Sequence, residues 1–141
     1  MKKALLSDID GTISDRSHRL HYLDYKKDWE SFFKHSIYDP PLNDTITQIE
    51  KSLPNYDKLI FVTGRPEKYK SVTESWIKSN TSFVDYILMM RGTNDWRDDV
   101  IVKYEMLNEI KRSYEVDVIY EDQEKLARMW EIEGLKCIRV T

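Results

Sequence analysis

The stretch Lys3-Ala-Leu-Leu-Ser-Asp8-Ile9-Asp10-Gly11-Thr12 decides the fold predicted for this chain of 141 residues. Its apolar start indicates a short β-strand over residues 3–7. Carboxylates two positions apart on a strand project to the same face. Asp8 ends the predicted strand and Asp10 already lies in a turn that Gly11 permits, so the two acids can bracket one reacting centre. An ordinary Asp-Gly turn with a capping aspartate is the alternative.

A short apolar run followed by apolar residues at helical spacing recurs along the chain. The further runs that indicate strands are residues 58–62, 86–90, 116–120 and 137–140. The residues at helical spacing are Leu42/Ile46/Ile49/Leu53, Tyr69/Val72/Trp76, Tyr104/Leu107/Ile110/Tyr114 and Leu126/Met129/Trp130. Alternating strands and helices predict an α/β protein with a Rossmann-like three-layer α/β/α fold around a parallel sheet of about five strands.

One segment, residues 15–41, interrupts this alternation with a polar loop, a short amphipathic helix and Pro40-Pro41. It is too short to be a separate domain. We therefore expect a single domain over residues 1–141, with a small helical insertion above the sheet edge that leaves any site beneath it open. Elsewhere, Pro66 suits the first position of a helix and Gly134 a helix C-terminal cap.

Composition excludes several classes of protein. The 22 Lys and Arg against 25 Asp and Glu give a net charge of −3, which argues against a protein that coats a nucleic-acid strand. A single cysteine excludes an internal disulfide framework and a cysteine-based zinc site. The longest apolar run is too short to span a membrane, and the N-terminus lacks the pattern of a signal peptide. We expect a cytoplasmic protein with no membrane contact.

Two further predicted strands end in residues that could bind a phosphate or a cation. In Thr63-Gly64-Arg65-Pro66, a hydroxyl, a glycine and a following helix suit a phosphate oxygen, although an ordinary turn with an exposed Arg65 has the same sequence. Glu121-Asp122 would complete an oxygen shell for a hard cation, although Asp122 could equally cap the helix that follows.

Lys103 lies one turn into the helix that is expected to begin near Asp98-Asp99. It is out of phase with the apolar stripe at Tyr104 and Leu107, so its charge could add to the positive end of the helix. Taken alone, a surface lysine paired with Asp99 is the simpler interpretation.

The joint placement of these motifs favours a functional site. Ligands of open parallel sheets bind at the carboxyl ends of the strands, and all four motifs follow such ends. Two carboxylate pairs, a hydroxyl and a lysine at one edge predict a site for Mg²⁺ and a phosphoryl group. No glycine-rich loop ending in Gly-Lys-Ser/Thr is present, so an aspartate nucleophile fits better than that ATP- or GTP-hydrolysing machinery.

The four motifs, in this order, resemble those of the haloacid dehalogenase (HAD) superfamily of phosphotransferases. The resemblance implies that Asp8 attacks phosphorus, while Asp10 protonates the leaving alcohol and then activates water. It implies further that Thr63 holds phosphoryl oxygens and that Lys103 offsets negative charge. Mg²⁺ would be held by the Asp8 carboxylate, the Asp10 main-chain carbonyl and Asp122.

Further segments resemble the 3′-phosphatase domain of polynucleotide kinase-phosphatase of phages and bacteria. They are Ser17-His-Arg-Leu-His21, Lys27-Asp-Trp-Glu-Ser-Phe-Phe33, Thr63–Pro66, Met90–Lys103 and Asp122–Leu135. The residues that this resemblance places against the substrate or its phosphate are Gly11, Thr12, Arg19, Gly64, Arg65 and Asp99, the last by orienting basic groups. Glu121 stands where an aspartate is usual, which leaves its role as a metal ligand open. The kinase half is missing, so we expect no phosphorylation activity.

These expectations leave three hypotheses about function. The first is a Mg²⁺-dependent phosphatase that removes 3′-phosphates from DNA or RNA ends. The second is a phosphatase for nucleotides or other small phosphomonoesters, and the third is a phosphate- or partner-binding module without catalysis. A separate kinase or ligase partner and the oligomeric state stay open. Trp96, Trp29, Tyr22 or Tyr25 could stack on a base, although Trp29 is expected to pack in the insertion instead.

Overall fold

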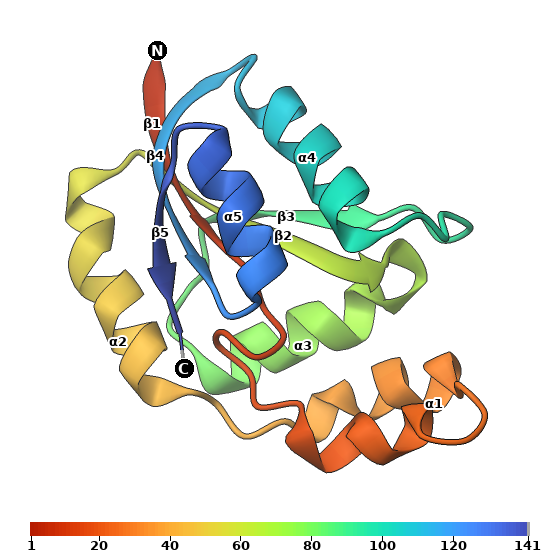
Figure 1. The fold of residues 1–141 in the computed structure, drawn as a ribbon. Helices are drawn as coiled ribbons and strands as arrows, with labels where there is room; N and C mark the ends of the chain where they lie inside the picture. Colours follow the sequence, from red (N-terminus) through yellow and green to blue (C-terminus); the bar gives the residue numbers. More distant parts are fainter. Residues whose placement is uncertain (141) are drawn as a thin grey trace.

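Five parallel strands form the central sheet of the computed structural model, which describes residues 1–140 (Figure 1). Their order in space is β3 (Tyr86–Arg91), β2 (Lys58–Pro66), β1 (Lys2–Ser7), β4 (Tyr114–Glu121) and β5 (Lys136–Arg139). The central strand β1 therefore pairs with β2 on one side and β4 on the other. The strand order reverses between β1 and β4, which is where open parallel sheets bind their ligands.

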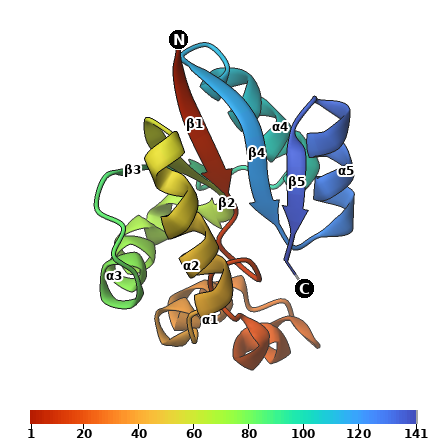
Figure 2. The same cartoon turned by 90° about the vertical axis from the view of Figure 1, so that its left-hand side faces the viewer.

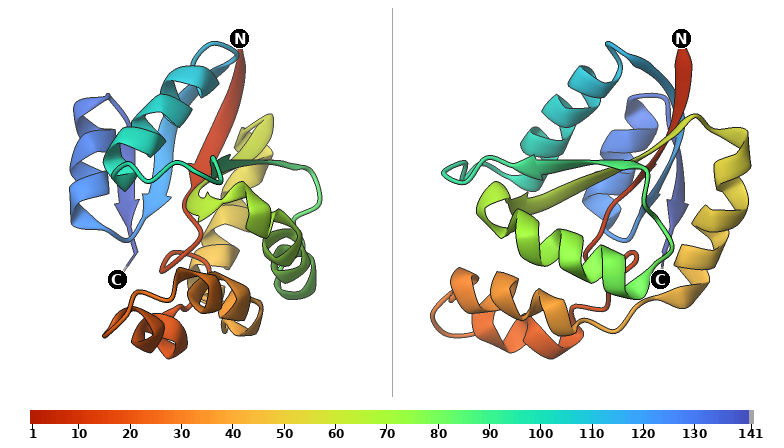
Figure 3. Two further views of the ribbon diagram at one scale, coloured as in Figure 1. Left: turned by 90° about the vertical axis from the view of Figure 1, so that its right-hand side faces the viewer. Right: turned by 180° about the vertical axis from the view of Figure 1, so that it is seen from behind.

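Helices cover both faces of the sheet, as Figures 2 and 3 show. The helices α2 (Asn43–Ser52) and α3 (Lys70–Asn80) lie on one face, and α4 (Asp99–Ile110) and α5 (Glu124–Ile132) lie on the other. Successive β1 residues point to opposite faces, so Leu5 joins the apolar cluster around Trp76 and Leu6 joins the cluster around Trp130. The predicted three-layer α/β/α fold is confirmed.

The insertion after β1 lies beyond the carboxyl ends of the central strands (Figure 1). It consists of α1 (Trp29–Lys34) between two 3-10 turns, Ser17–Leu23 and His35–Tyr38. Its two ends are joined, because the Asp15 amide donates to the Pro40 carbonyl over 2.8 Å. A strand-like bridge from Ser14 to Pro41 closes the same junction.

Three local expectations were wrong. Pro66 does not begin a helix: it continues β2 opposite Arg91, and α3 begins only at Lys70, after a 3-10 turn. Asp122 does not cap α5, because Gln123 occupies the N-cap position without a side-chain bond. Tyr104 is 41% exposed and lies off the buried stripe of α4.

Gly134 follows α5 with a φ of 93°, which is the left-handed conformation expected at a helix C-terminus. Within residues 1–140, no helix combines the length and the apolar character needed to cross a bilayer.

Candidate active site

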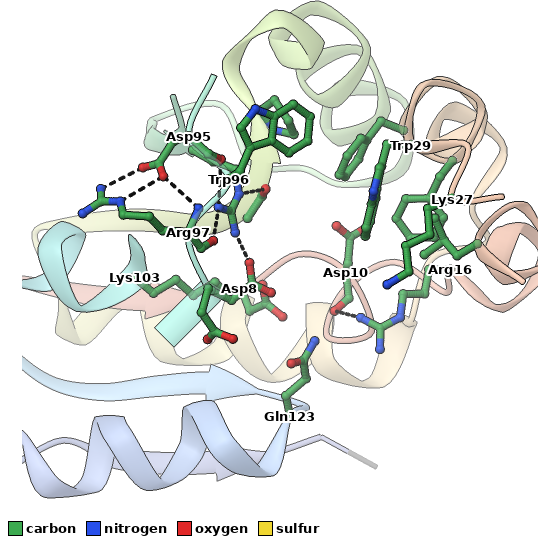
Figure 4. Close-up of a pocket in the computed structure, with 18 of the residues that line it drawn as sticks. Asp8, Asp10, Arg16, Lys27, Trp29, Asp95, Trp96, Arg97, Lys103 and Gln123 are labelled. Atoms are coloured by element: carbon green, nitrogen blue, oxygen red, sulfur yellow. Dashed lines mark hydrogen bonds and ion pairs between the residues drawn. The ribbon is translucent and has the colours of Figure 1, made fainter. Parts of the chain in front are cut away.

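The carboxyl ends of β1 and β2, the start of α4 and the insertion surround a cavity of about 710 Å³ (Figure 4). The predicted site residues that line it are Asp8, Asp10, Gly64, Asp99 and Lys103. Seven others lie behind or beside this lining: Gly11, Thr12, Arg19, Thr63, Arg65, Glu121 and Asp122. The motifs that lie far apart in sequence thus do meet at one edge of the sheet.

Asp8 and Lys103 form a buried ion pair at the floor of the cavity. Lys103 Nζ lies 2.7 Å from Asp8 Oδ1 and 3.4 Å from Glu121 Oε1, and the residue is only 2% exposed. The alternative of a surface lysine paired with Asp99 is therefore wrong. Asp8 Oδ2 accepts a hydrogen bond of 3.1 Å from the Thr12 hydroxyl, so both oxygens of the carboxylate are held.

Carboxylates outnumber ammonium groups around this ion pair. Burial, with the Glu121 carboxylate, raises the pKa of Asp8 to about 7 even though Lys103 acts in the opposite direction. Burial acts against the charge of Lys103, but Asp8 and Glu121 outweigh it and keep the pKa of the ammonium above its usual value. The floor of the cavity therefore holds one ammonium against more than one carboxylate.

Asp122 adds a further carboxylate beside Asp8. One oxygen each from Asp8, Glu121 and Asp122 lie within 4.8 Å of one another. Burial and the charge of Asp8 raise the pKa of Asp122 to about 6, with Arg16 opposing the shift from 3.6 Å away. Because carboxylate oxygens with uncompensated negative charge are what a hard divalent cation binds, this donor set fits Mg²⁺.

Glu121 differs from Asp122 in that its carboxylate is already satisfied by the protein. Its Oε2 accepts from the backbone amides of Asp122 at 3.1 Å and Gln123 at 3.3 Å. Its Oε1 accepts from Trp130 Nε1 at 3.2 Å and faces Lys103. The contacts of Glu121 hold the turn after β4 and orient Lys103.

Gly11 is required by the close approach of Asp122 to the turn after β1. Its φ is 79°, and a Cβ atom at this position would lie 2.2 Å from Asp122 Oδ2. Gly64 is required in a similar way by Asp99, whose Oδ1 would lie 2.7 Å from an added Cβ. Both glycines make room for a carboxylate of the site.

Asp10 is held by two buried guanidinium groups. Arg65 donates from Nε to Asp10 Oδ2 at 3.0 Å and from Nη2 to Oδ1 at 2.7 Å, and Arg19 donates to Oδ1 as well. Burial alone would raise the pKa of Asp10, but the positive charges of Arg65 and Arg19 hold it well below its usual range. Asp10 is therefore ionised in this arrangement.

Neither arginine lines the cavity, although the resemblance to known phosphatases implies contact with the substrate phosphate. Behind Asp10, the Arg19 guanidinium donates to both oxygens of buried Asp39, at 2.8 and 2.7 Å. Arg65 also donates to the hydroxyls of Ser36 at 3.3 Å and Thr73 at 3.1 Å. The structure thus places both arginines where they hold the Asp10 carboxylate in position and keep it ionised.

Hydrogen bonds from Arg65 and Arg91 hold the carboxyl end of β2 in place. The Thr63 hydroxyl accepts from the Arg65 amide at 3.1 Å and is fully buried. Arg91 pairs with Asp99 and donates to the Gly64 carbonyl at 2.9 Å. These contacts tie β2 to the start of α4, the helix that delivers Lys103.

Sequence reasoning missed three residues of this site: Asp39, Arg16 and Arg91. Asp39 belongs to an irregular segment and contacts Arg19 only through the path of the insertion, so no periodic pattern could identify it. Arg16 follows the motif of Asp8 and Asp10 closely, and that proximity was the available signal. Arg91 ends β3, at the same sheet edge as the other strand ends.

Comparisons with known proteins agree with this geometry. Residues 2–141 match the family model described as the polynucleotide kinase PNKP phosphatase domain. A putative bifunctional polynucleotide kinase/RNA ligase of Autographa californica nuclear polyhedrosis virus is 28% identical over 131 residues, which are 92% of this chain and 18% of that protein. This chain therefore spans less than a fifth of that relative.

Solved structures with similar folds include one with clear sequence similarity and one without it. A chain of the Pnkp1/Rnl/Hen1 RNA repair complex has 29% identity and a TM-score of 0.82, over 99% of this chain and 42% of that one. The class C acid phosphatase of Bacillus anthracis with tungstate bound has a TM-score of 0.71 at 10% identity, over 99% of this chain and 66% of that one, which shows a shared fold. Since the family model covers nearly the whole chain, the protein belongs to the HAD family of polynucleotide kinase PNKP phosphatase domains.

Proposed function

We propose that this domain is a Mg²⁺-dependent phosphomonoesterase that works through an aspartyl-phosphate on Asp8 and removes 3′-phosphates from DNA or RNA ends. The observation that supports it best is the placement of the Asp8 carboxylate. It lies at the floor of the cavity, between the Lys103 ammonium at 2.7 Å and the carboxylates of Glu121 and Asp122. A buried nucleophile beside a fixed positive charge is suited to phosphoryl transfer.

Asp8 and Asp122, with the Asp10 main-chain carbonyl, would hold Mg²⁺, which supplies positive charge to neutralise the carboxylates and the phosphoryl oxygens. In the first step, an oxygen of Asp8 forms a bond to phosphorus and the ester P–O bond breaks. Lys103 stabilises the negative charge that gathers on the transferring group. The leaving alkoxide takes a proton from Asp10.

Asp10 must therefore take up a proton from solvent before the first turnover, and in later turnovers it uses the proton that it gains in the second step. A phosphoryl group in the cavity opposes a second negative charge nearby and raises the pKa of Asp10 from its low resting value. In the second step, ionised Asp10 takes a proton from water, the water oxygen attacks phosphorus, and the bond to Asp8 breaks to release phosphate. Arg19 and Arg65 hold the carboxylate in place through both steps.

The choice of substrate rests on the family and on the open cavity. The domain belongs to the family of polynucleotide kinase PNKP phosphatase domains, and it is similar to a putative bifunctional polynucleotide kinase/RNA ligase and to a chain of an RNA repair complex. The insertion forms one wall of a cavity that is not fully enclosed and that reaches Asp8, so a strand end could enter it. We propose that a kinase or ligase, fused or separate, acts on the same ends.

A substrate panel tests this proposal. We expect phosphate release from a 3′-phosphorylated oligonucleotide with Mg²⁺, at least as efficient as from a 3′-mononucleotide, and none with EDTA. A preference for the mononucleotide, with no gain from added length, would contradict the nucleic-acid end as substrate. Activity that persists in EDTA would contradict the role of the metal.

The nucleophile is tested separately by Asp8→Asn. This substitution removes a charge from a repulsive cluster, so the fold should persist, as circular dichroism would show. Turnover of every phosphomonoester in the panel should fall below detection. Retained turnover would exclude an aspartyl-phosphate at this position.

A further inference from the structure

Two tryptophans stand at the cavity without a role in the phosphate chemistry. Trp96 lies in the loop between β3 and α4, and its side chain is 77% exposed. Trp29 begins α1 in the insertion and is 37% exposed. Both line the cavity, and Figure 4 shows them on opposite sides of it with Asp8 and Asp10 below.

The loop that presents Trp96 is firmly braced. Arg91 Nη1 donates to the backbone carbonyls of Asp95 at 3.1 Å and Arg97 at 2.6 Å, on either side of the tryptophan. The Arg97 guanidinium in turn bonds the Asp95 carboxylate. The braced loop therefore holds a large aromatic ring against the cavity, where it can contact a bound ligand.

The Trp29 ring is held by aromatic packing within the insertion. Its ring stacks on Phe33 at 5.8 Å with an interplanar angle of 20°, and it meets Phe32 edge-on at 5.8 Å. Packing therefore fixes the ring while part of it stays open to the cavity. Both the expected packing role of Trp29 and a binding role are compatible with this arrangement.

A positive charge accompanies this ring. The Lys27 ammonium lies 5.9 Å from the centre of the Trp29 ring. Lys27 also lines the cavity, and within residues 1–140 it forms no ion pair with a carboxylate, so its charge is available to a ligand. Because the ammonium lies over the ring, a base that stacks there would displace it towards the phosphate beside that base.

We propose that Trp96 and Trp29 form a stacking site for the unpaired base of the terminal nucleotide, with Lys27 at the next backbone phosphate. This inference rests on the proposed function and names the form of its substrate: a single-stranded end. Bases within a duplex are paired and stacked on their neighbours, so a blunt end must open before its base can lie between the rings. Stacking tolerates every base, so little sequence preference is expected.

The test compares wild type, Trp96→Ala, Trp96→Phe and Tyr38→Ala. Tyr38 is an aromatic residue, 72% exposed and outside the cavity lining, and its variant is the matched control. The substrates are a single-stranded 3′-phosphorylated oligonucleotide, the same end in a blunt duplex, and the same oligonucleotide with an abasic terminal nucleotide. Trp29 is not substituted, because its packing makes loss of structure an alternative cause.

For Trp96→Ala we expect a rise in KM of roughly 5- to 150-fold on the single strand, the range of base–aromatic stacking, with kcat nearly unchanged. The abasic substrate should show no such rise, Trp96→Phe should recover most of the affinity, and Tyr38→Ala should match wild type. Wild type should prefer the single strand to the blunt duplex.

Equal losses on the abasic and the normal substrate, or an unchanged KM for Trp96→Ala, would overturn the stacking site. So would equal efficiency of wild type on single strand and blunt duplex. These outcomes differ from failure of the proposed function, in which wild type would release no phosphate from any of the three oligonucleotides.

Discussion

The ionisation of Asp10 depends on side chains that never reach the cavity. Arg65 offers two nitrogens to this carboxylate and a third to Ser36 and Thr73, all from one planar group. Arg19 joins Asp10 to Asp39 in the same way. Since both guanidiniums are buried, their fixed geometry positions the acid that the proposed mechanism needs.

We expect Arg65→Lys to impair catalysis although it conserves the charge. A lysine ammonium cannot hold both Asp10 oxygens and the two hydroxyls at once, so Asp10 loses its fixed position. Turnover should fall at least about 10-fold, and the free energy of unfolding should fall by roughly 1–3 kcal/mol because buried polar groups lose a partner. Steady-state kinetics and urea denaturation measure the two effects.

Arg128→Lys is the control, because Arg128 lies exposed on α5 and, among residues 1–140, pairs only with Glu124 on the same helix. It should match wild type in both measurements. An Arg65→Lys variant with wild-type turnover would show that Asp10 does not depend on the planar group.

At the scale of elements, the turn after β1 determines how the proposed metal ligands meet. Its glycine has a positive φ, and the space beside it is filled by the Asp122 carboxylate from the end of β4. The turn therefore connects two strands that are adjacent only in the folded sheet.

The substitutions Gly11→Ala and Gly134→Ala separate backbone strain from this contact. Both glycines have a positive φ, of 79° and 93°, but an added Cβ at Gly134 meets no atom of the described residues within 4 Å. Each variant should lose roughly 1–2 kcal/mol of stability from strain. Only Gly11→Ala should also displace Asp122, and so weaken activation by Mg²⁺ in a titration of turnover. Equal activation of the two variants would contradict the contact.

At the scale of the whole molecule, negative charge accumulates where β1 and β4 end. The pKa values of Asp8 and Asp122, about 7 and 6, lie above that of a free aspartate. In the metal-free protein, the stability linked to these groups is present below about pH 4 and is lost as pH rises towards 7, because the folded state must then hold repelling charges.

Asp122→Asn should relieve this repulsion. Near pH 7 and without metal, the variant should melt about 2–4 °C above wild type, the shift expected for roughly 1 kcal/mol. Added Mg²⁺ should raise the melting temperature of wild type by mass action but not that of the variant. Glu115→Gln, on the exposed part of β4, is the control and should keep the response to Mg²⁺. A variant that still responds would exclude Asp122 as a ligand.

The sequence predicted the architecture because alternating apolar runs and helical spacing are local signals. It also predicted that Asp8, Lys103 and Asp122 lie together, since a parallel sheet brings its strand ends to one edge. The pair of Arg19 and Asp39 could not be predicted, because it depends on the path of an irregular segment. The burial of Lys103 and exposure of Tyr104 depended on how α4 is turned against the sheet, which the apolar stripe alone did not determine.

The closed junction at Ser14 and Pro41 has a consequence for protein engineering. Because the insertion leaves and rejoins the domain at neighbouring points, a segment of another length could be grafted there without disturbing the sheet. The graft would not be neutral, however, since Arg19 and Asp39 would leave with the exchanged segment. A chimera would keep Asp8, Lys103 and Arg65 but would lose one of the two guanidinium groups that hold Asp10.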